Sequence, residues 1–349
     1  MNRKEFLKYS GIGALALGIC PTLCCTGPRN RRELARPSLE ASKDFDPDLE
    51  VELTARPDEV QIFPGEPTRV YTYHSKVTRG DPAQVTTIDE SYAGPVFRVR
   101  QGQNIRVFFH NQLPDESIIH WHGLHLPPEM DGHPRYAVGN NETYVYELEI
   151  VDPAGTYWFH PHPHGITGVQ VYRGLAGLFI VSDQQEEELN LPSGGFDLPL
   201  IIQDRTFARN NQMQYLEHGM MDRMAGFFGE TILVNGKREL LQVAANAYRL
   251  RVINGSNARI YKLAWSDQTP IVVIGTDGGL IGEPVSKPYL MLAPGERAEI
   301  WKDFSGYEQG STVFLRSLGF DDGARMGPGD RMGPMMRLSG WIPLNYGNS

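Results

Sequence analysis

The sequence predicts an all-β protein. Apolar and polar residues alternate in short segments such as Ile105–Phe109 and Tyr144–Ile150, which is the period of a half-buried strand and not of a helix. The chain contains 37 glycines and 25 prolines, about 18% of its residues against about 12% on average, which indicates frequent turns. With 349 residues, 40% of them hydrophobic, it is long enough for about two or three domains with sizeable cores.

Residues 1–28 predict an export signal. A basic start is followed by the apolar run Gly11–Ile19, which is too short to span a bilayer. The segment resembles a twin-arginine signal with Arg3-Lys4 in place of the arginine pair. The alternative is lipid attachment at Cys20, Cys24 or Cys25, although the residues before them are larger than a lipoprotein signal prefers. We expect an exported protein, periplasmic or otherwise extracytoplasmic, with lipid anchoring ranked second.

The rest of the chain divides by composition and strand pattern. A polar, charged stretch precedes the first strand pattern, and an acidic run followed by Pro-Ser-Gly-Gly separates two strand-rich regions, which predicts an exposed crossing. The predicted parts are a tether at 29–49, domain one at 50–184, a linker at 185–196, domain two at 197–320, and a Gly-, Met- and Pro-rich tail at 321–349.

Two short histidine clusters favour a metal site. They are His120-Trp121-His122-Gly123 and His160-Pro161-His162-Pro163-His164-Gly165. Residues i and i+2 of a strand project to one face, so each pair can present two imidazoles in the same direction. The prolines remove ladder donors, so the second strand must end there. A separation of about forty residues suits a Greek-key connection that brings two strands back together.

Ligand type alone leaves the metal open, because imidazole binds copper, zinc, nickel and iron alike. Ordinary core or surface histidines are the alternative explanation. Two His-x-His pairs, each followed by glycine, make that alternative the weaker one.

Longer stretches around these histidines resemble the multicopper oxidases, the laccase-like family of cupredoxin-domain enzymes, and specifically their bacterial three-domain branch. The resemblance extends over roughly residues 50 to 320 and implies two cupredoxin-like Greek-key domains, each a β-barrel or sandwich. The matching segments are His120–Pro127, Met130–Gly132, Gly155–Gly165, Arg173–Leu178, Ile232–Lys237, Arg249–Arg259, Ile274–Gly279 and Leu292–Arg297.

The resemblance implies copper as the cofactor. In the family pattern His120 would bind the type 2 copper, and His122, His160 and His162 would bind the type 3 pair. A blue type 1 copper needs a cysteine thiolate with two histidines. All three cysteines of this chain lie in the leader, so no type 1 site is expected.

Three further polar residues lie in the matching segments. Asp131 falls where relatives keep an acidic group near the trinuclear cluster, which implies a proton relay for oxygen reduction. An Asp-Gly turn is the structural alternative at that position. His125 and His164 have no ligand role in the family pattern and are expected at the rim of the site, or as hydrogen-bond partners that orient a ligand.

The family's remaining copper motifs belong to a third domain. After His164 the only histidine is His218. The resemblance therefore implies domains one and two of a three-domain oxidase, with domain two free of copper and the third domain missing. We expect this chain alone to be inactive unless a separate chain supplies the third domain.

Methionines gather in two stretches that could handle Cu(I), since thioethers are soft ligands. The first is Met213–Met224, around His218, and the second is Met326–Met336, in the predicted tail. A flexible loop and a low-complexity end are the favoured alternative.

The charge balance excludes some partners. The formal net charge is −9, and the rest of the chain is more acidic still once the basic leader is set aside. Such a surface repels nucleic acid and anionic membranes. It does not repel cationic metal ions or small neutral phenols.

Three functions stay open. The first is copper-dependent oxidation of a phenolic or metal-ion substrate coupled to reduction of oxygen to water. The second is a copper-binding or structural cupredoxin-like envelope protein without oxidase activity. The third is an inactive truncated fragment.

Overall fold

Strands dominate the computed structural model, which confirms the predicted all-β class. The structure describes residues 40–216, 219, 224, 226–238, 241–320 and 341–346. The predicted export signal, His218 and the methionines at 326–336 lie outside these residues. Within the described part, none of the helices is long and apolar enough to cross a bilayer.

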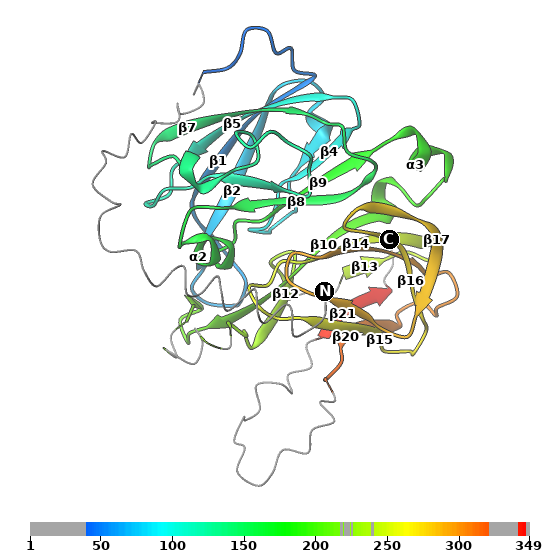
Figure 1. Ribbon diagram of the computed structural model, residues 1–349. Coiled ribbons are helices and arrows are strands. Elements are labelled where there is room, and N and C mark those ends of the chain that lie inside the picture. The colour runs from blue at the N-terminus through cyan, green and yellow to red at the C-terminus, as the bar shows by residue number, and fades with distance from the viewer. Residues whose placement is uncertain are drawn as a thin grey trace, which may run out of the picture. The chain divides into compact units, whose positions relative to one another are not determined.

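Domain one consists of two sheets around one apolar core (Figure 1). The first sheet has the order β2 (Thr68–Arg79), β1 (Leu49–Val60), β5 (Asn104–Asn111), β7 (Glu142–Glu149), and the second has the order β3 (Val85–Thr86), β4 (Val96–Arg100), β9 (Gly177–Ser182), β8 (Gly155–Pro161), β6 (Ile119–His122). The predicted alternation in β5 and β7 is confirmed, because Ile105, Val107, Phe109, Tyr146 and Leu148 are fully buried.

Domain two repeats the two-sheet plan around a second core. Its larger sheet has the order β11 (Met213–Gln214), β10 (Asp197–Phe207), β14 (Ala247–Asn254), β19 (Arg297–Asp303), β16 (Ile271–Thr276), β17 (Gly279–Lys287), with β12 (Thr231–Val234) paired to β10. The smaller sheet has the order β13 (Leu241–Val243), β21 (Trp341–Tyr346), β20 (Thr312–Ser317), β15 (Tyr261–Trp265), β18 (Leu290–Leu292). The strand β21 lies beyond residue 320, where the sequence pattern placed the end of domain two.

The predicted tether is only partly separate from domain one. Arg106 of β5 donates hydrogen bonds to the carbonyl oxygens of Ser42 and Phe45. Its guanidinium also lies over the Phe45 ring, 5.4 Å from the ring centroid. Residues 42–45 therefore pack on the first sheet.

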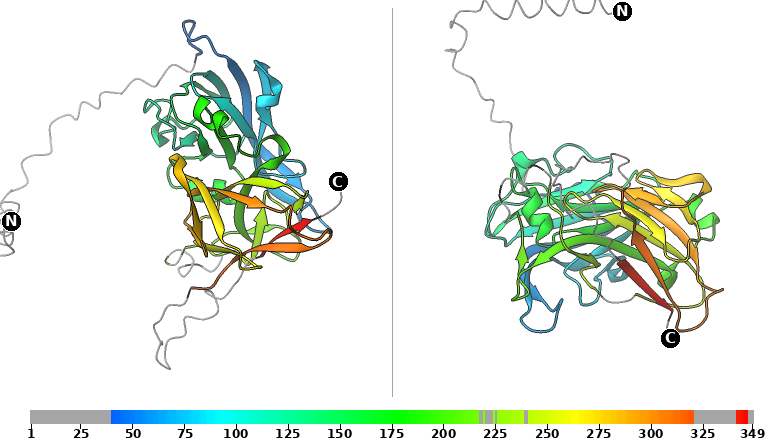
Figure 2. Two further views of the ribbon diagram at one scale, coloured as in Figure 1. Left: turned by 90° about the vertical axis from the view of Figure 1, so that its right-hand side faces the viewer. Right: turned by 90° about the horizontal axis from the view of Figure 1, so that it is seen from below.

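The two domains lie side by side in one compact unit (Figure 2), and apolar side chains of both pack together at their interface. Trp158, Leu178 and Ile180 of domain one form one cluster with Ile201 and Ile253 of domain two.

Two glycines meet at the same boundary. A Cβ at Gly155 would lie 2.9 Å from the Cα of Gly279, and a Cβ at Gly279 would lie 2.5 Å from the carbonyl oxygen of Ala154. Real Cβ atoms do not approach so closely. Domain two therefore packs directly on the main chain where β8 begins.

The linker differs from the prediction of an exposed crossing. Residues Gln184–Glu188 form the short helix α3, whose first turn is capped by Asp183, and Gly194–Phe196 form a 3-10 turn. The acidic run was expected to be solvated, yet Glu186 is buried. Its carboxylate pairs with Arg249 and Arg251 of β14, and those guanidinium groups supply the compensating charge.

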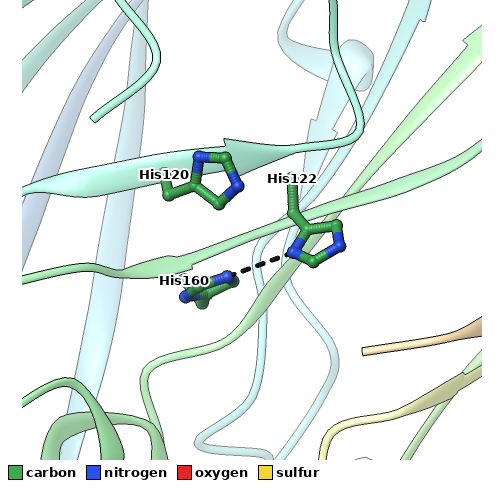
Figure 3. A group of neighbouring side chains, drawn as sticks. All are labelled: His120, His122 and His160. Atoms are coloured by element: carbon green, nitrogen blue, oxygen red, sulfur yellow. Dashed lines mark hydrogen bonds between the residues drawn. The ribbon is translucent and has the colours of Figure 1, made fainter. Parts of the chain in front are cut away.

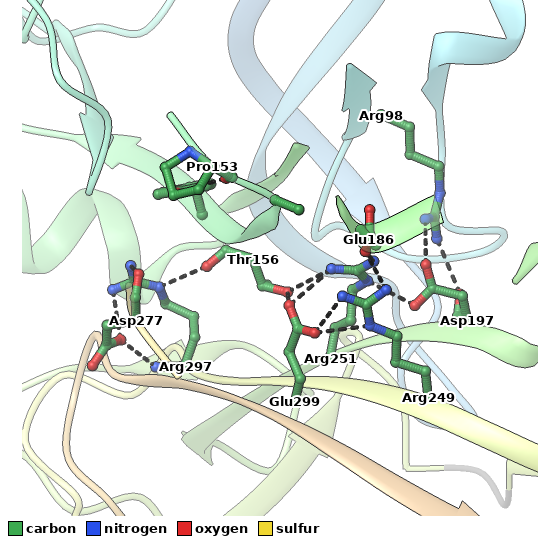
Figure 4. A network of polar contacts seen from close by, with 12 residues as sticks. Arg98, Pro153, Thr156, Glu186, Asp197, Arg249, Arg251, Asp277, Arg297 and Glu299 are labelled. Atoms are coloured by element: carbon green, nitrogen blue, oxygen red, sulfur yellow. Dashed lines mark hydrogen bonds and ion pairs between the residues drawn. The ribbon is translucent and has the colours of Figure 1, made fainter. Parts of the chain in front are cut away.

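A buried ion-pair network extends from the linker into domain two (Figure 4). Glu299 of β19 accepts hydrogen bonds from both Arg249 and Arg251 and from the Thr156 hydroxyl of β8. Asp197 joins Arg251 to Arg98 of domain one. The network includes residues of domain one, the linker and domain two, so its geometry ties them together.

We predict that Glu299→Gln lowers the free energy of unfolding by about 3 kcal/mol, because breaking a buried ion pair leaves an uncompensated charge. The control is Glu187→Gln, since Glu187 pairs with Arg100 while its side chain is 52% exposed, and exposed pairs contribute little. Urea unfolding of both variants measures the difference. Equal midpoints would contradict the prediction.

Candidate metal centre

The two histidine pairs lie on neighbouring antiparallel strands. His120 of β6 stands opposite His160 of β8, and His122 stands opposite Trp158. The strand β8 ends at Pro161, where the missing N–H interrupts the ladder. Figure 3 shows the imidazoles of His120, His122 and His160 turned toward one another from the two strands.

The rings are close enough to share metal ions. One ring nitrogen from each of His120, His122 and His160 lies within 4.8 Å of the others. The His162 ring is centred 5.3 Å from the His120 ring and 6.1 Å from the His160 ring. The structure thus brings all four histidines together, with His162 at the side nearest His120.

Main-chain carbonyl groups fix two of the ring orientations. The Nδ1 of His160 lies 2.9 Å from the Pro161 carbonyl oxygen, and the Nδ1 of His120 lies 2.7 Å from the Asp131 carbonyl oxygen. A carbonyl only accepts, so each Nδ1 carries the hydrogen and each Nε2 keeps its lone pair. The Nδ1 of His162 is buried without a hydrogen-bond partner. The Nε2 atoms of His120 and His160 therefore carry lone pairs that can bind a metal.

Burial favours the neutral form of His122, His160 and His162 by lowering the pKa of each ring. Burial lowers the pKa of His160 to about 3, with the neighbouring histidines adding to the shift. Burial and then the Arg297 charge lower the pKa of His122 to about 4. Burial also lowers the pKa of His162. Neutral imidazole is the form that binds a metal, so protons do not compete for these nitrogens near neutral pH.

The loop after β6 covers the strand that bears the first pair. A Cβ at Gly132 would lie only 2.0 Å from the carbonyl oxygen of Ile119, and its φ is +78°. Only glycine permits this approach. The carboxylate of Asp131 is 44% exposed and lies 3.2 Å from the Nδ1 of His120. Asp131 therefore contacts both a candidate ligand and solvent.

Domain two supplies part of the site's wall, which the sequence patterns did not reveal. An open groove of about 490 Å³ is lined by His120 and His122 of domain one and by Asp277 and Arg297 of domain two. The Arg297 guanidinium donates to the carbonyl oxygens of Thr156, Gly295 and Asp277. The sequence resemblance in Leu292–Arg297 predicts no role for Arg297.

Arg297 lies directly against the strand end that bears His122. A Cβ at Gly123 would lie 2.8 Å from its Nη2. Gly123 has a φ of +98°, a backbone conformation that favours glycine.

His125 and His164, the two histidines expected at the rim, lie on the surface. The His125 side chain is 80% exposed, and its Nδ1 lies 2.5 Å from the buried carboxylate of Asp152. His164 is exposed at the turn after β8. Of the first methionine stretch, Met213 is half-buried on β11 and Met224 is 81% exposed.

Comparison with known proteins identifies relatives of this chain. A family model described as "Multicopper oxidase" matches residues 69–186. The chain is 33% identical over 314 residues to the cell division protein FtsP of Shigella dysenteriae, covering 88% of this chain and 61% of that protein. It is 33% identical over 277 residues to a laccase of Bacillus stratosphericus, covering 68% of this chain and 54% of that protein.

Solved structures agree with the sequence relatives. The McoA multicopper oxidase from the hyperthermophile Aquifex aeolicus superposes with a TM-score of 0.72 at 36% identity, over 87% of this chain and 63% of that one. The cupredoxin-like fold prediction is thereby confirmed. The chain spans 61% of the first curated relative's length.

We predict that the metal-free protein loses stability as the pH falls from about 6.5 toward 4. Below 6.5 the unfolded chain protonates His122 and His160, whereas the folded chain does not until about 4 and 3. The unfolded state therefore binds more protons in this pH range, so the free energy of unfolding decreases as the pH is lowered. Urea unfolding between pH 4 and 7 measures this slope. It should flatten in His122→Gln/His160→Gln, and an unchanged slope would contradict the prediction.

We predict that Gly132→Ala destabilises the protein far more than Gly165→Ala. Both residues have left-handed backbones, with φ of +78° and +77°, so both variants incur that strain, about 1–2 kcal/mol. Only position 132 adds a clash, because nothing lies within 4 Å of a Cβ at 165. Thermal unfolding of the pair isolates the clash. Equal melting temperatures would show that the loop moves away without cost.

Proposed function

The chain belongs to the multicopper oxidase family, and on that premise we propose that domain one binds copper through His120, His122, His160 and His162. The observation that supports this most directly is the convergence of these rings at one end of β6 and β8, with three ring nitrogens within 4.8 Å. Imidazole is a good ligand for copper.

The residues present fit the metal. His120 and His160 each keep a lone pair on Nε2, because a carbonyl accepts from Nδ1 in each ring. The buried Nδ1 of His162 has no hydrogen-bond partner, which a metal ion would supply. The Nδ1 of His122 lies 3.3 Å from the Nε2 of His160. At most one hydrogen lies between those two atoms, and metal binding would displace it.

The four histidines divide by the family pattern. His120 is proposed as a ligand of a type 2 copper, and His122, His160 and His162 as ligands of a type 3 pair. Bound copper would supply one-electron redox chemistry at this place. The four rings leave coordination positions open, and we propose that ligands from another polypeptide segment, such as a separate chain with a third domain, complete them.

Asp131 is proposed as the proton relay. Its carboxylate reaches the Nδ1 of His120 at 3.2 Å while remaining 44% exposed. A group in that place can take a proton from solvent and hold it beside the site. Its main-chain carbonyl orients His120 at the same time.

For the complete assembly we propose oxidation of a phenolic or metal-ion substrate coupled to reduction of oxygen to water. The 33% sequence identity to a protein named as a laccase supports this proposed activity. The chain itself has no cysteine after residue 25, so a type 1 site would have to come from elsewhere. We also propose export, from the basic and apolar character of residues 1–28.

A structural or copper-binding role without oxidase activity is the second candidate. The relative that covers 88% of this chain is named as a cell division protein. Such a role needs the two folded domains but no electron entry site. Copper binding by the four histidines distinguishes a copper-binding protein from a purely structural one.

We predict that the purified chain binds Cu(II) without the intense blue colour of a copper–thiolate bond and without appreciable laccase turnover. The double variant His122→Gln/His160→Gln removes one imidazole from each pair and should lower the Cu(II) affinity at least 10-fold. The control is His74→Gln/His110→Gln, on the other sheet of domain one. Calorimetric titration with Cu(II) decides it, and unchanged affinity in the first variant would refute the assignment.

A further inference from the structure

The main chain just before His120 depends on one side chain from the opposite sheet. The strand β6 lies at the edge of its sheet and pairs with β8. The N–H of Ile119 donates to the phenol oxygen of Tyr146 at 2.8 Å, and the same hydroxyl donates to the Ile119 carbonyl oxygen at 2.9 Å. Tyr146 lies on β7, so its hydroxyl joins the two sheets of domain one across the core.

The position of Ile119 in the ladder leaves its N–H and carbonyl oxygen to bond with Tyr146. Ile119 and Tyr146 are both 0% exposed, so water does not reach them. The N–H of His162 donates to the Ile118 carbonyl oxygen, and bonded pairs alternate along an antiparallel ladder, so the N–H and carbonyl oxygen of Ile119 point away from β8. Burial raises the pKa of Tyr146 well above its ordinary value. The phenol therefore stays protonated and keeps both its donor and its acceptor.

The loop that contains Asp131 and Gly132 also packs against the Ile119 carbonyl oxygen. Gly132 approaches this oxygen so closely that a Cβ there would lie 2.0 Å away. The main-chain carbonyl of the preceding residue, Asp131, accepts a hydrogen bond from the Nδ1 of His120. A shift of the Ile119 peptide would therefore move the His120 main chain and the group that orients its ring.

We propose that Tyr146 is a positioning residue of the metal centre: its hydroxyl fixes the Ile119–His120 peptide and thereby the direction of the His120 imidazole. It acts without touching metal or substrate. The inference rests on the proposed function, copper binding by the four histidines. Hydrogen-bond partners that orient a ligand typically change metal affinity 10–100-fold when they are removed.

The chain offers a matched control on the same strand. Tyr144 lies two residues before Tyr146, on the same buried face, with ring centroids 4.8 Å apart. Its hydroxyl donates to the carbonyl oxygen of Glu129 at 2.5 Å and makes no bond to β6. Tyr144→Phe therefore removes the same atom and one hydrogen bond from the same core, but leaves the Ile119 peptide held.

The experiment compares the wild-type chain, Tyr146→Phe and Tyr144→Phe by calorimetric Cu(II) titration and by electron paramagnetic resonance of the copper-loaded proteins. We expect Tyr146→Phe to bind Cu(II) at least 10-fold more weakly, with an altered copper hyperfine splitting. Tyr144→Phe should match the wild type in both. A purely structural role would lower the free energy of unfolding and leave the spectrum of the folded, loaded protein unchanged.

The outcomes separate two failures. Copper affinities and spectra that are equal in the two variants would overturn the role of Tyr146 and leave the proposed function standing. A wild-type chain that binds no Cu(II) would overturn the proposed function and this inference with it.

Hydrogen exchange of the wild-type chain decides the matter if Tyr146→Phe does not fold. If the Tyr146 bond supports copper binding, copper must support that bond by the same factor. Loading with Cu(II) should therefore slow exchange of the Ile119 amide more than that of the Val107 amide on β5. Equal slowing of the two amides would overturn the proposal.

Discussion

The antiparallel register of β6 against β8 is the constraint on which the metal centre depends. Because His120 stands opposite His160, four imidazoles emerge on one face. Trp121, between the first pair, is fully buried on the other face, within 6.1 Å of the ring centroids of Phe97, Tyr146, Phe159 and Phe179. A slip of one residue would expel this indole from the core, so apolar packing fixes the position of the histidines.

Domain two acts on the site without contributing a histidine from the residues that the structure describes. Arg297 packs on Gly123 at the end of β6, and its charge adds to the burial that lowers the pKa of His122. Behind it, Glu299 and Glu186 hold Arg249 and Arg251 in place. Buried ion pairs are weak evidence for stability. We interpret this network as a device that permits one arrangement of the two domains, and hence one wall for the site.

Much of this architecture could be predicted from local sequence. The period-2 pattern of Ile105–Phe109 requires a strand, and each His-x-His pair on a strand faces one way. Contacts between distant residues could not be predicted. Glu186 belongs to an acidic run that resembles a solvated surface, and it is buried because two arginines more than sixty residues later compensate its charge. The bond from His120 to the Asp131 carbonyl uses the main chain, which residue type does not reveal.

The contact between Gly155 and Gly279 limits how this protein can change over time. A Cβ at Gly155 would meet the Cα of Gly279, and a Cβ at Gly279 would meet the Ala154 carbonyl oxygen, so neither position has room for a side chain. Domain one can be recombined with the second domain of a relative only if both partners keep this bare main-chain contact. The main-chain contact at this boundary therefore constrains the sequences of both domains together.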